Sequence, residues 1–355
     1  MADILRKYVV DSGYDLFRDL MFKVTEDDPE LAHQFFIEGA QLINEEFNLS
    51  KILLDNSANN LEIPFELSNA AGFNKNGDIP PNFLKYLGFN RVVVGTVTND
   101  PWKGNEVSPR IWRYPQTESL INFLGQPGVG SKRVREILNS HGRIDIPLTI
   151  SIINTPKKEG DAILRDLENT LIDLRHFGDI IELKESCPSL AHSTDEYQKA
   201  FKNRLEVITQ NSYGKKIRVK VSPDLPIQRV FETLDVIQDY AGNGVSGIVG
   251  TNTTTKHDSI YIPNSPKKGG ASGQAVQHLS RVIQEQFITE IRNRRLPLEY
   301  ISVGGIDSAD EAGYRIYLGA SGIQLLTGLI FKGPRLVREI RNRLSPIDVD
   351  YTHKY

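Results

Sequence analysis

The chain has 355 residues, of which 39% are hydrophobic and 25% are charged, a globular balance that excludes a disordered chain. The 42 Lys and Arg residues nearly match the 45 Asp and Glu residues, and the net charge of −3 gives no electrostatic reason to expect nucleic acid as a partner. The apolar runs are too short to span a bilayer, and the N-terminus lacks the basic start and apolar block of a secretory signal.

Residues 1–60 are predicted to form a small helical extension. The segment DPELAHQFFIEGAQLINEEF predicts an amphipathic helix that starts near Asp28, with Pro29 in its first turn. One face of this helix carries Leu31, Phe35 and Leu42. The preceding segment adds Leu16, Phe17, Leu20, Met21 and Phe22. These apolar side chains either pack on the rest of the protein, the interpretation we favour, or form a cap whose apolar face touches a membrane surface.

From residue 61 onward, short apolar segments alternate with segments of helical periodicity. Eight segments are predicted strands: 61–67, 91–97, 147–153, 179–185, 217–222, 245–251, 299–305 and 322–328. Near-continuous apolar runs are typical of strands that are buried on both faces of a parallel sheet. Helical spacing is evident at Val134, Ile137 and Leu138; at Leu164, Leu167 and Leu171; at Val230, Leu234 and Ile237; at Val282, Phe287 and Ile291; and at Leu336, Ile340 and Leu344.

This alternation predicts an α/β fold, a closed (β/α)8 TIM barrel with an outer ring of helices. An open, doubly wound parallel sheet is the alternative. No repeat, proline-rich linker or low-complexity tract divides the region. The predicted organisation is therefore a helical extension over residues 1–60, a barrel over 61–345 and a C-terminal tail over 346–355.

In a TIM barrel the active site is built by the loops that follow the strands. The loop after the first predicted strand, SNAAGFNKNG, contains Ala71 and Gly72, which are small enough for a flat ligand to approach the backbone. Lys75 in the same loop is either a cation that faces the ligand or an ordinary solvated turn residue.

A long connection, residues 98–146, follows the second predicted strand. Thr96 lies at the end of that strand, and Asn122 begins the glycine-rich half of the connection, LINFLGQPGVG. A connection of this length inside a compact barrel is usually functional.

The only cysteine, Cys187, lies just after the fourth predicted strand. A lone cysteine is normally a small buried hydrophobe. Here it precedes a proline in a loop at the expected catalytic face, where its thiolate could accept a proton if neighbouring groups favour the charged form. Lys184, three residues earlier, is one such neighbour.

Polar residues also mark the fifth and sixth predicted strands. Lys220 lies within the alternating run RVKVS, where a lysine requires an acceptor such as a cofactor carbonyl or ring nitrogen. Thr251, Asn252 and Thr253 follow the sixth strand. Their amide and hydroxyl groups are suited to the edge of a flat polar heterocycle, although a hydrogen-bonded turn explains them equally well.

Glycine clusters follow the last two predicted strands, at Gly304-Gly305 and around Leu326-Thr327. The loops after these strands commonly bind phosphate in TIM barrels through backbone N–H groups. GGASG, with Ser272 and Gly273, offers another glycine-rich edge. These clusters, opposite a lysine and a turn of small residues, predict a flat cofactor that carries a phosphate.

Metal and serine-nucleophile chemistry have no support in the sequence. The seven histidines are scattered without HxxH or HExxH spacing, so no metal site is predicted. A GxSxG motif is absent, and a single cysteine excludes an internal disulfide and any zinc site built on paired thiolates.

The ordered motifs AAGFNKNG, VVVGTVT, LINFLG, VKVSPDL, TNTTT, GGASG, VGGIDSADEA and QLLTGLIFKGP resemble those of the dihydroorotate dehydrogenase family of FMN-dependent barrels. The similarity runs from about Asp28 to Leu344. The N-terminal DPELAH segment resembles the quinone-linked, membrane-associated class, which carries such a helical cap.

The resemblance implies roles for individual residues. The residues implied to hold or assist FMN are Ala71, Gly72, Lys75, Thr96, Asn122, Lys220, Thr251, Ser272, Gly273, Gly304, Gly305, Leu326 and Thr327. The residues implied to face the substrate are Lys75, Asn122, Asn252 and Thr253. Cys187 takes the position of the catalytic base, in the manner of the soluble class, whereas the quinone-linked class usually has a serine there.

The chain also departs from the family pattern. Lys184 and Ser189 stand where asparagines are expected around the base, and Lys157 stands where an asparagine usually touches the flavin. Leu326 replaces an aromatic residue. Amide groups that donate and accept hydrogen bonds are thus replaced in part by lysines that only donate.

The implied reaction is oxidation of dihydroorotate to orotate in pyrimidine biosynthesis, with Cys187 as general base and hydride transfer to FMN. The alternatives are an FMN oxidoreductase acting on another dihydropyrimidine or an unsaturated carbonyl compound, and a non-catalytic ligand-binding relative. The extension fits a quinone as electron acceptor, whereas the cysteine fits fumarate. The expected location is the cytoplasm, with peripheral contact to the inner face of the membrane through the N-terminal helices as the alternative.

Overall fold

The computed structural model describes residues 18, 22–25, 28–46, 63–185 and 194–345. The predicted apolar positions Leu16, Phe17, Leu20 and Met21 therefore lie outside the described residues, as do Cys187 and Ser189.

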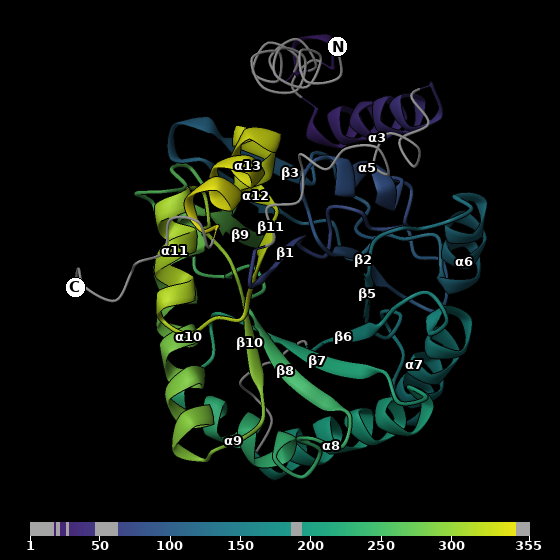
Figure 1. Cartoon of the computed structure of the whole chain (residues 1–355), viewed down its shortest axis with the longest axis vertical. Helices are drawn as coiled ribbons and strands as arrows, with labels where there is room; N and C mark the ends of the chain where they lie inside the picture. The colour runs from purple at the N-terminus through teal and green to yellow at the C-terminus, as the bar shows by residue number, and fades with distance from the viewer. Residues whose placement is uncertain (1–17, 19–21, 26–27, 47–62, 186–193, 346–355) are drawn as a thin grey trace.

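Eight parallel strands form the barrel that the sequence predicts (Figure 1). In chain order they are β1 (Glu66–Asn69), β2 (Val92–Val97), β5 (Leu148–Ile152), β6 (Ile180–Lys184), β7 (Lys216–Val221), β8 (Val245–Gly250), β10 (Glu299–Val303) and β11 (Gly322–Leu325). Their order around the sheet is β1-β11-β10-β8-β7-β6-β5-β2. The open-sheet alternative is therefore wrong, because the two outermost strands, β1 and β2, also meet.

Side-chain amides complete the seam between β1 and β2. A single parallel bridge joins Ser68 to Arg91. Beyond it, Asn69 donates from Nδ2 to the carbonyl of Val93 (2.7 Å) and accepts from the Val93 N–H (3.1 Å). From the β2 side, Asn90 accepts from the Leu67 N–H at 2.7 Å with its Oδ1 and donates to the Phe65 carbonyl at 2.9 Å with its Nδ2. These side chains satisfy backbone groups that a longer ladder would otherwise pair.

Helices surround the barrel as an outer ring (Figure 1). They are α5 (Pro81–Tyr86), α6 (Ser131–Ser140), α7 (Asp161–Leu174), α8 (Thr194–Asn211), α9 (Ile227–Ile237), α10 (Gln274–Asn293), α11 (Ala309–Tyr317), α12 (Thr327–Lys332) and α13 (Pro334–Arg343). Most of the positions with helical spacing face inward. Val134, Leu167 and Leu234, for example, are buried in the core between the helices and the strands. This burial explains why the alternating pattern is readable.

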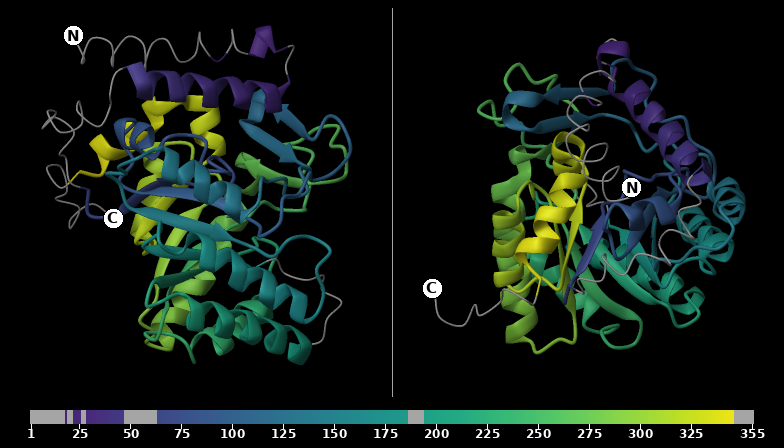
Figure 2. Two further views of the ribbon diagram at one scale, coloured as in Figure 1. Left: turned by 90° about the vertical axis from the view of Figure 1, so that its right-hand side faces the viewer. Right: turned by 45° about the horizontal axis from the view of Figure 1, so that its top comes forward.

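Helix α3 (Pro29–Glu46) confirms the helix predicted from Asp28, whose carboxylate caps it by accepting from the Glu30 N–H at 2.9 Å. Figure 2 shows α3 lying across one end of the barrel. Its inner face contacts α5 and β3. Of the apolar side chains expected to pack on the protein, Phe22 is buried, whereas Leu31, Phe35 and Leu42 are 45%, 44% and 61% exposed.

A three-stranded antiparallel sheet stands beside the barrel mouth. It consists of β3 (Ile111–Tyr114), β4 (Ser119–Asn122) and β9 (Gly270–Gly273), in that order. A short 3-10 turn, Pro115–Thr117, joins β3 to β4. The long connection is thus structured, and GGASG is a strand rather than a loop edge. A four-residue strand containing two glycines has no pattern of its own, so its pairing with β4 could not be predicted locally.

Two barrel strands differ in extent from their predicted segments. The first begins at Glu66 rather than at 61, since residues 64–65 form a bend. The last ends at Leu325, and Thr327 already belongs to α12. Apolar character continues across both boundaries because the flanking residues are also buried, and hydrophobicity alone therefore does not locate the strand end.

The seam generates a stability prediction. Replacing Asn69 with alanine removes both side-chain hydrogen bonds to Val93 and leaves a buried N–H and a buried carbonyl unpaired. We expect the free energy of unfolding to fall by about 2–4 kcal/mol. Asn139→Ala, at an exposed position of α6, is the matched control and should change it by less than about 0.5 kcal/mol. Chemical denaturation of both variants measures the difference, and equal effects would contradict a role for the seam.

Candidate active site

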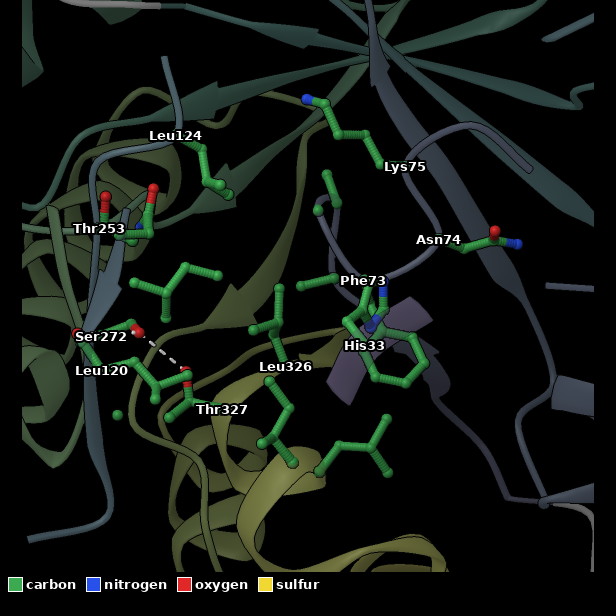
Figure 3. A pocket seen from close by; sticks show the side chains of 18 of the residues that line it. His33, Phe73, Asn74, Lys75, Leu120, Leu124, Thr253, Ser272, Leu326 and Thr327 are labelled. Atoms are coloured by element: carbon green, nitrogen blue, oxygen red, sulfur yellow. Dashed lines mark hydrogen bonds between the residues drawn. The ribbon is translucent and has the colours of Figure 1, made fainter. Parts of the chain in front are cut away.

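The ends of the barrel strands and the inner face of α3 surround a cavity of about 470 Å³ (Figure 3). Every predicted site residue that the structure describes lines it: Ala71, Gly72, Lys75, Thr96, Asn122, Lys220, Thr251, Asn252, Thr253, Ser272, Gly273, Gly304, Gly305, Leu326 and Thr327. Lys184 lines it as well. Lys157 does not, because its side chain is exposed and its ammonium lies over the ring of Trp102 at 5.3 Å.

The loop after β1 holds Lys75 in a fixed position. The buried Asn74 side chain donates to the Ile79 carbonyl (2.8 Å) and accepts from the Ile79 N–H (3.0 Å), which closes the loop on itself. Lys75 then reaches the carbonyl of Thr96 with its ammonium at 3.3 Å. Burial, together with the nearby charge of Lys184, lowers the pKa of Lys75 to about 8.

Strands β6 and β7 bring two more lysines to the cavity. Lys184 and Lys220 are direct partners in the parallel register. The Lys220 ammonium donates to Gln324 Oε1 at 3.2 Å and lies 3.7 Å from Glu182 Oε1, and Gln324 donates in turn to the other Glu182 oxygen at 2.9 Å. Within the described part of the chain, Lys184 makes no hydrogen bond or ion pair. Burial and the charge of Lys220 lower the pKa of Lys184 to about 8, against an opposing effect of Glu182.

The ends of β9, β10 and β11 form a different kind of lining. The Thr327 hydroxyl donates to the Ser272 hydroxyl at 2.9 Å, and in Figure 3 this pair lies across the pocket from Lys75, with Leu326 between them. Gly305 has φ of +72°, and a Cβ there would lie 2.4 Å from Gln277 of α10. Only glycine therefore lets this turn approach α10 so closely and leave its backbone at the cavity wall.

Arg315 of α11 holds the Gly304 turn from behind. Its side chain is fully buried and donates to the Gly304 carbonyl (2.9 Å), the Ser280 hydroxyl (2.7 Å) and the Ser302 hydroxyl (3.2 Å). Glu311, one helical turn earlier, accepts from Arg315 Nε and balances its charge. A planar guanidinium with several donors suits this position better than a lysine would.

Amides and hydroxyls occupy the lining between these two ends. Asn122 at the end of β4 donates to the Gly270 carbonyl at 3.2 Å, which fixes its amide beside β9. The Asn252 N–H donates to the Val221 carbonyl at 2.8 Å, so the segment after β8 is tied to β7. Thr251 is buried. The lining thus offers fixed hydrogen-bonding groups suited to the edge of a flat polar ring.

Several lining residues were not predicted from the sequence. His33 of α3 lines the cavity and contacts the Phe73 ring edge-on, and burial is the main reason that its pKa is lowered. Arg113 of β3 lines it too, with its guanidinium over the Phe22 ring. Glu182, which lies behind Lys220, was not predicted either, although a charged residue inside an apolar strand segment is a signal that the sequence offers. His33 and Arg113 gave none, since their access to the cavity depends on how α3 and β3 fold over the barrel.

The cavity fits a flat ligand with one anionic end. The Ser272–Thr327 pair and the glycine turns line the end where phosphate commonly binds in this fold, and Thr327 begins α12, whose first N–H groups have no partner within the helix. Lys220 and the amides line the other end. Among the described residues, no cluster of three or more acidic, histidine or cysteine side chains could hold a metal ion.

The fold and the lining together define a TIM barrel with a cavity at its strand ends whose groups suit a flat polar ligand. The family model described as "Dihydroorotate dehydrogenase" matches residues 29–347. The chain belongs to the dihydroorotate dehydrogenase family, whose members are flavin oxidoreductases.

Similar proteins cover most of the chain. A protein named dihydroorotate dehydrogenase (quinone) from Helicobacter acinonychis is 30% identical over 340 residues, 92% of each chain. One of the same name from Haloarcula marismortui is 33% identical over 284 residues, 78% of this chain and 77% of the relative. The crystal structure of the Eimeria tenella enzyme with ferulenol has a TM-score of 0.72 at 23% identity, covers 89% of this chain and 90% of its own, and supports the fold.

The buried arginine generates a prediction for the site. Arg315→Lys keeps the charge but cannot reach all the acceptors around the Gly304 turn, so we expect the free energy of unfolding to fall by about 1–3 kcal/mol and bound flavin to be retained less well. The matched control is Arg335→Lys, an exposed pair with Glu339 on α13, which should change neither quantity. Denaturation and the flavin-to-protein absorbance ratio measure both, and a flavin ratio unchanged in Arg315→Lys would contradict the positioning role.

Proposed function

We propose that the protein is an FMN-dependent enzyme that oxidises dihydroorotate to orotate. The observation that carries this proposal is the single cavity that gathers the glycine turns, the hydroxyl pair, the amides and the lysines at the strand ends of a barrel of this family. The names of the relatives support the same reaction.

FMN, when bound, supplies the hydride acceptor. Ser272, Thr327 and the glycine turns would hold its phosphate, and the small residues after β1 would let the ring approach the backbone. Lys220, kept in place by Gln324 and Glu182, would stabilise negative charge on the reduced ring. Asn122, Asn252 and Thr253 would orient the substrate ring.

Cys187 would act as the general base. In the sequence it follows Lys184, the last residue of β6, by three positions, and the loops after the strands carry the catalytic residues of TIM barrels. Its thiolate would take the proton from C5 of dihydroorotate while the hydride leaves C6, so that a C=C bond forms and two electrons leave the substrate. The family resemblance and the position of Cys187 in the sequence support this role.

We also propose a quinone as the electron acceptor, as in the names of the relatives. Helix α3 supports this because its inner face lines the cavity through Ala32, His33 and Phe36 while its outer face exposes apolar side chains. An apolar acceptor held at a membrane surface could reach the cavity past this helix. No helix in the described ranges has the length and apolar character needed to cross a membrane.

We also propose the division of the chain that the sequence predicts. Residues 1–60 would form the helical extension, 61–345 the barrel and 346–355 a tail.

One observation favours a second candidate function on the same scaffold. Lys184 lies in the cavity where the family pattern has an asparagine, so a different reduced pyrimidine or an unsaturated carbonyl compound is the alternative substrate. Anaerobic flavin bleaching by dihydroorotate, compared with bleaching by other reduced pyrimidines, separates the two candidates.

The reaction itself is tested by the visible spectrum of the FMN-loaded protein. Dihydroorotate added without oxygen should bleach the oxidised flavin, whereas a protein that keeps its colour would overturn the proposed activity. Cys187→Ala should slow this bleaching by about 100-fold or more, because a positioned base contributes 10²–10⁴ to the rate. Cys187→Ser is the conservative companion, and bleaching as fast as the parent's in both variants would remove the thiol from the mechanism.

The acceptor side is tested by the exposed face of α3. Phe35→Ser with Leu42→Ser removes apolar area worth about 1.5–3 kcal/mol per fully buried side chain, so binding to phospholipid vesicles should weaken more than tenfold. Turnover with a long-chain quinone in vesicles should fall with it, while turnover with a water-soluble acceptor should not. Ile172→Ser, an exposed apolar position on α7, is the control. Vesicle binding unchanged in the double variant would contradict the membrane contact.

A further inference from the structure

Lys184 lines the cavity and has no partner among the residues that the structure describes. It ends β6, and its side chain lines the cavity beside Lys220, its neighbour in register on β7. No residue in the described part of the chain accepts a hydrogen bond from it or lies within ion-pair distance. A lysine held out of water in this way is costly unless an anion completes its surroundings.

Other buried cations of the barrel are paired. Arg218, at the opposite end of β7, bonds Glu66 and Glu299 at 2.8–2.9 Å. Arg204 is paired with the buried Glu185, which follows Lys184 in the chain and faces α8 instead. The chain thus supplies carboxylates to buried cations whose surroundings are entirely protein. Lys184, at the cavity wall, has no such carboxylate among the described residues. This difference points to a partner that is not part of the protein.

The charges that face Lys184 leave an excess of positive charge. Lys220 on β7 and Lys75 in the loop after β1 repel it, and Glu182 on its own strand attracts it. Glu182 is already engaged by Lys220 and by Gln324 of β11. Three ammonium groups therefore share one carboxylate at this end of the cavity, which would accommodate a further negative charge.

We infer that Lys184 is a substrate-binding residue which, together with Lys75, holds the anionic carboxylate of the substrate. This inference rests on the proposed function and extends it, because it makes the site selective for reduced heterocycles that carry an anionic group over neutral ones. At this position the family pattern has an asparagine, whose amide donates and accepts hydrogen bonds, whereas a lysine only donates. Lys184 therefore discriminates by the charge of the ligand rather than by the hydrogen-bonding groups of its ring.

The arrangement makes ligand binding depend on pH in a defined direction. In the free site both Lys75 and Lys184 have a pKa of about 8, which is lower than usual. A bound carboxylate favours the charged lysines and raises both pKa values, so binding takes up protons near pH 8. Affinity for the anion is full below about pH 7. Above about pH 8 it falls by up to tenfold per pH unit for each lysine.

The test uses orotate as the probe and the FMN-loaded protein. Calorimetric titration at pH 8 in two buffers of different ionisation enthalpy gives the number of protons taken up. Two groups that are each half protonated should together take up about one proton in the parent. Lys184→Gln should take up about half a proton or less, because Lys75 alone remains and is no longer repelled. Orotate affinity at pH 7 should fall about 10- to 100-fold, the effect of losing one charged hydrogen bond.

Two further variants control this result. Lys184→Arg keeps a positive charge at every pH and still repels Lys75, so its proton uptake should lie between that of Lys184→Gln and that of the parent, while orotate affinity at pH 7 is retained within a few-fold. Lys157→Gln removes an exposed lysine outside the cavity and should behave as the parent. FMN content should be unchanged in all three variants.

The inference is overturned if Lys184→Gln binds orotate with the affinity and proton uptake of the parent, or if it loses FMN instead of orotate affinity. Failure of the proposed function has a different signature. In that case the parent itself neither binds orotate nor bleaches with dihydroorotate, while a parent that does both and is unaffected by Lys184→Gln refutes only the role of Lys184.

Discussion

Closure of the barrel between β1 and β2 is the constraint on which the site depends. The two strands share a single bridge, and the amides of Asn69 and Asn90 complete the seam. Closure also joins the two loops that follow these strands, since the Gly72 N–H donates to the Gly95 carbonyl and the Gly95 N–H donates to the Asn74 carbonyl. Lys75 reaches Thr96 only because these loops are held together.

Charge is distributed differently at the two ends of the barrel interior. At one end Arg218 is saturated by two carboxylates. At the other, Lys75 bonds one carbonyl and Lys184 has no partner in the described part of the chain, and the pKa of each lysine falls to about 8. The first arrangement is a closed ion-pair cluster, whereas the second costs stability until an anion arrives. Such a contrast within one barrel separates structural charges from functional ones.

Much of the fold could be predicted from the sequence because strands and helices have different periodicities and because the apolar faces of both are buried here. The loops after strands could be identified for the same reason, and they supplied nearly all the cavity residues. Contacts between residues that lie far apart in the chain could not be predicted from the sequence. β9 becomes a strand only because β4 offers an edge, and Arg315 acts on Gly304 from another helix. Lys184 was recognised as a departure, but its lack of a partner depends on which carboxylates reach it.

Helix α3 joins these elements to the outside of the molecule. Arg110, just before β3, forms a two-pronged ion pair with Glu30, and Gln41 donates to the Asp78 carbonyl at 3.0 Å, so the helix is anchored at both the small sheet and the loop that carries Lys75. Its inward residues form part of the cavity wall, which makes the helix a component of the site and not only an appendage. The apolar side chains on its outer face, Leu31, Phe35 and Leu42, therefore lie one helix width from the cavity wall, so the proposed membrane contact and the site share a single structural element.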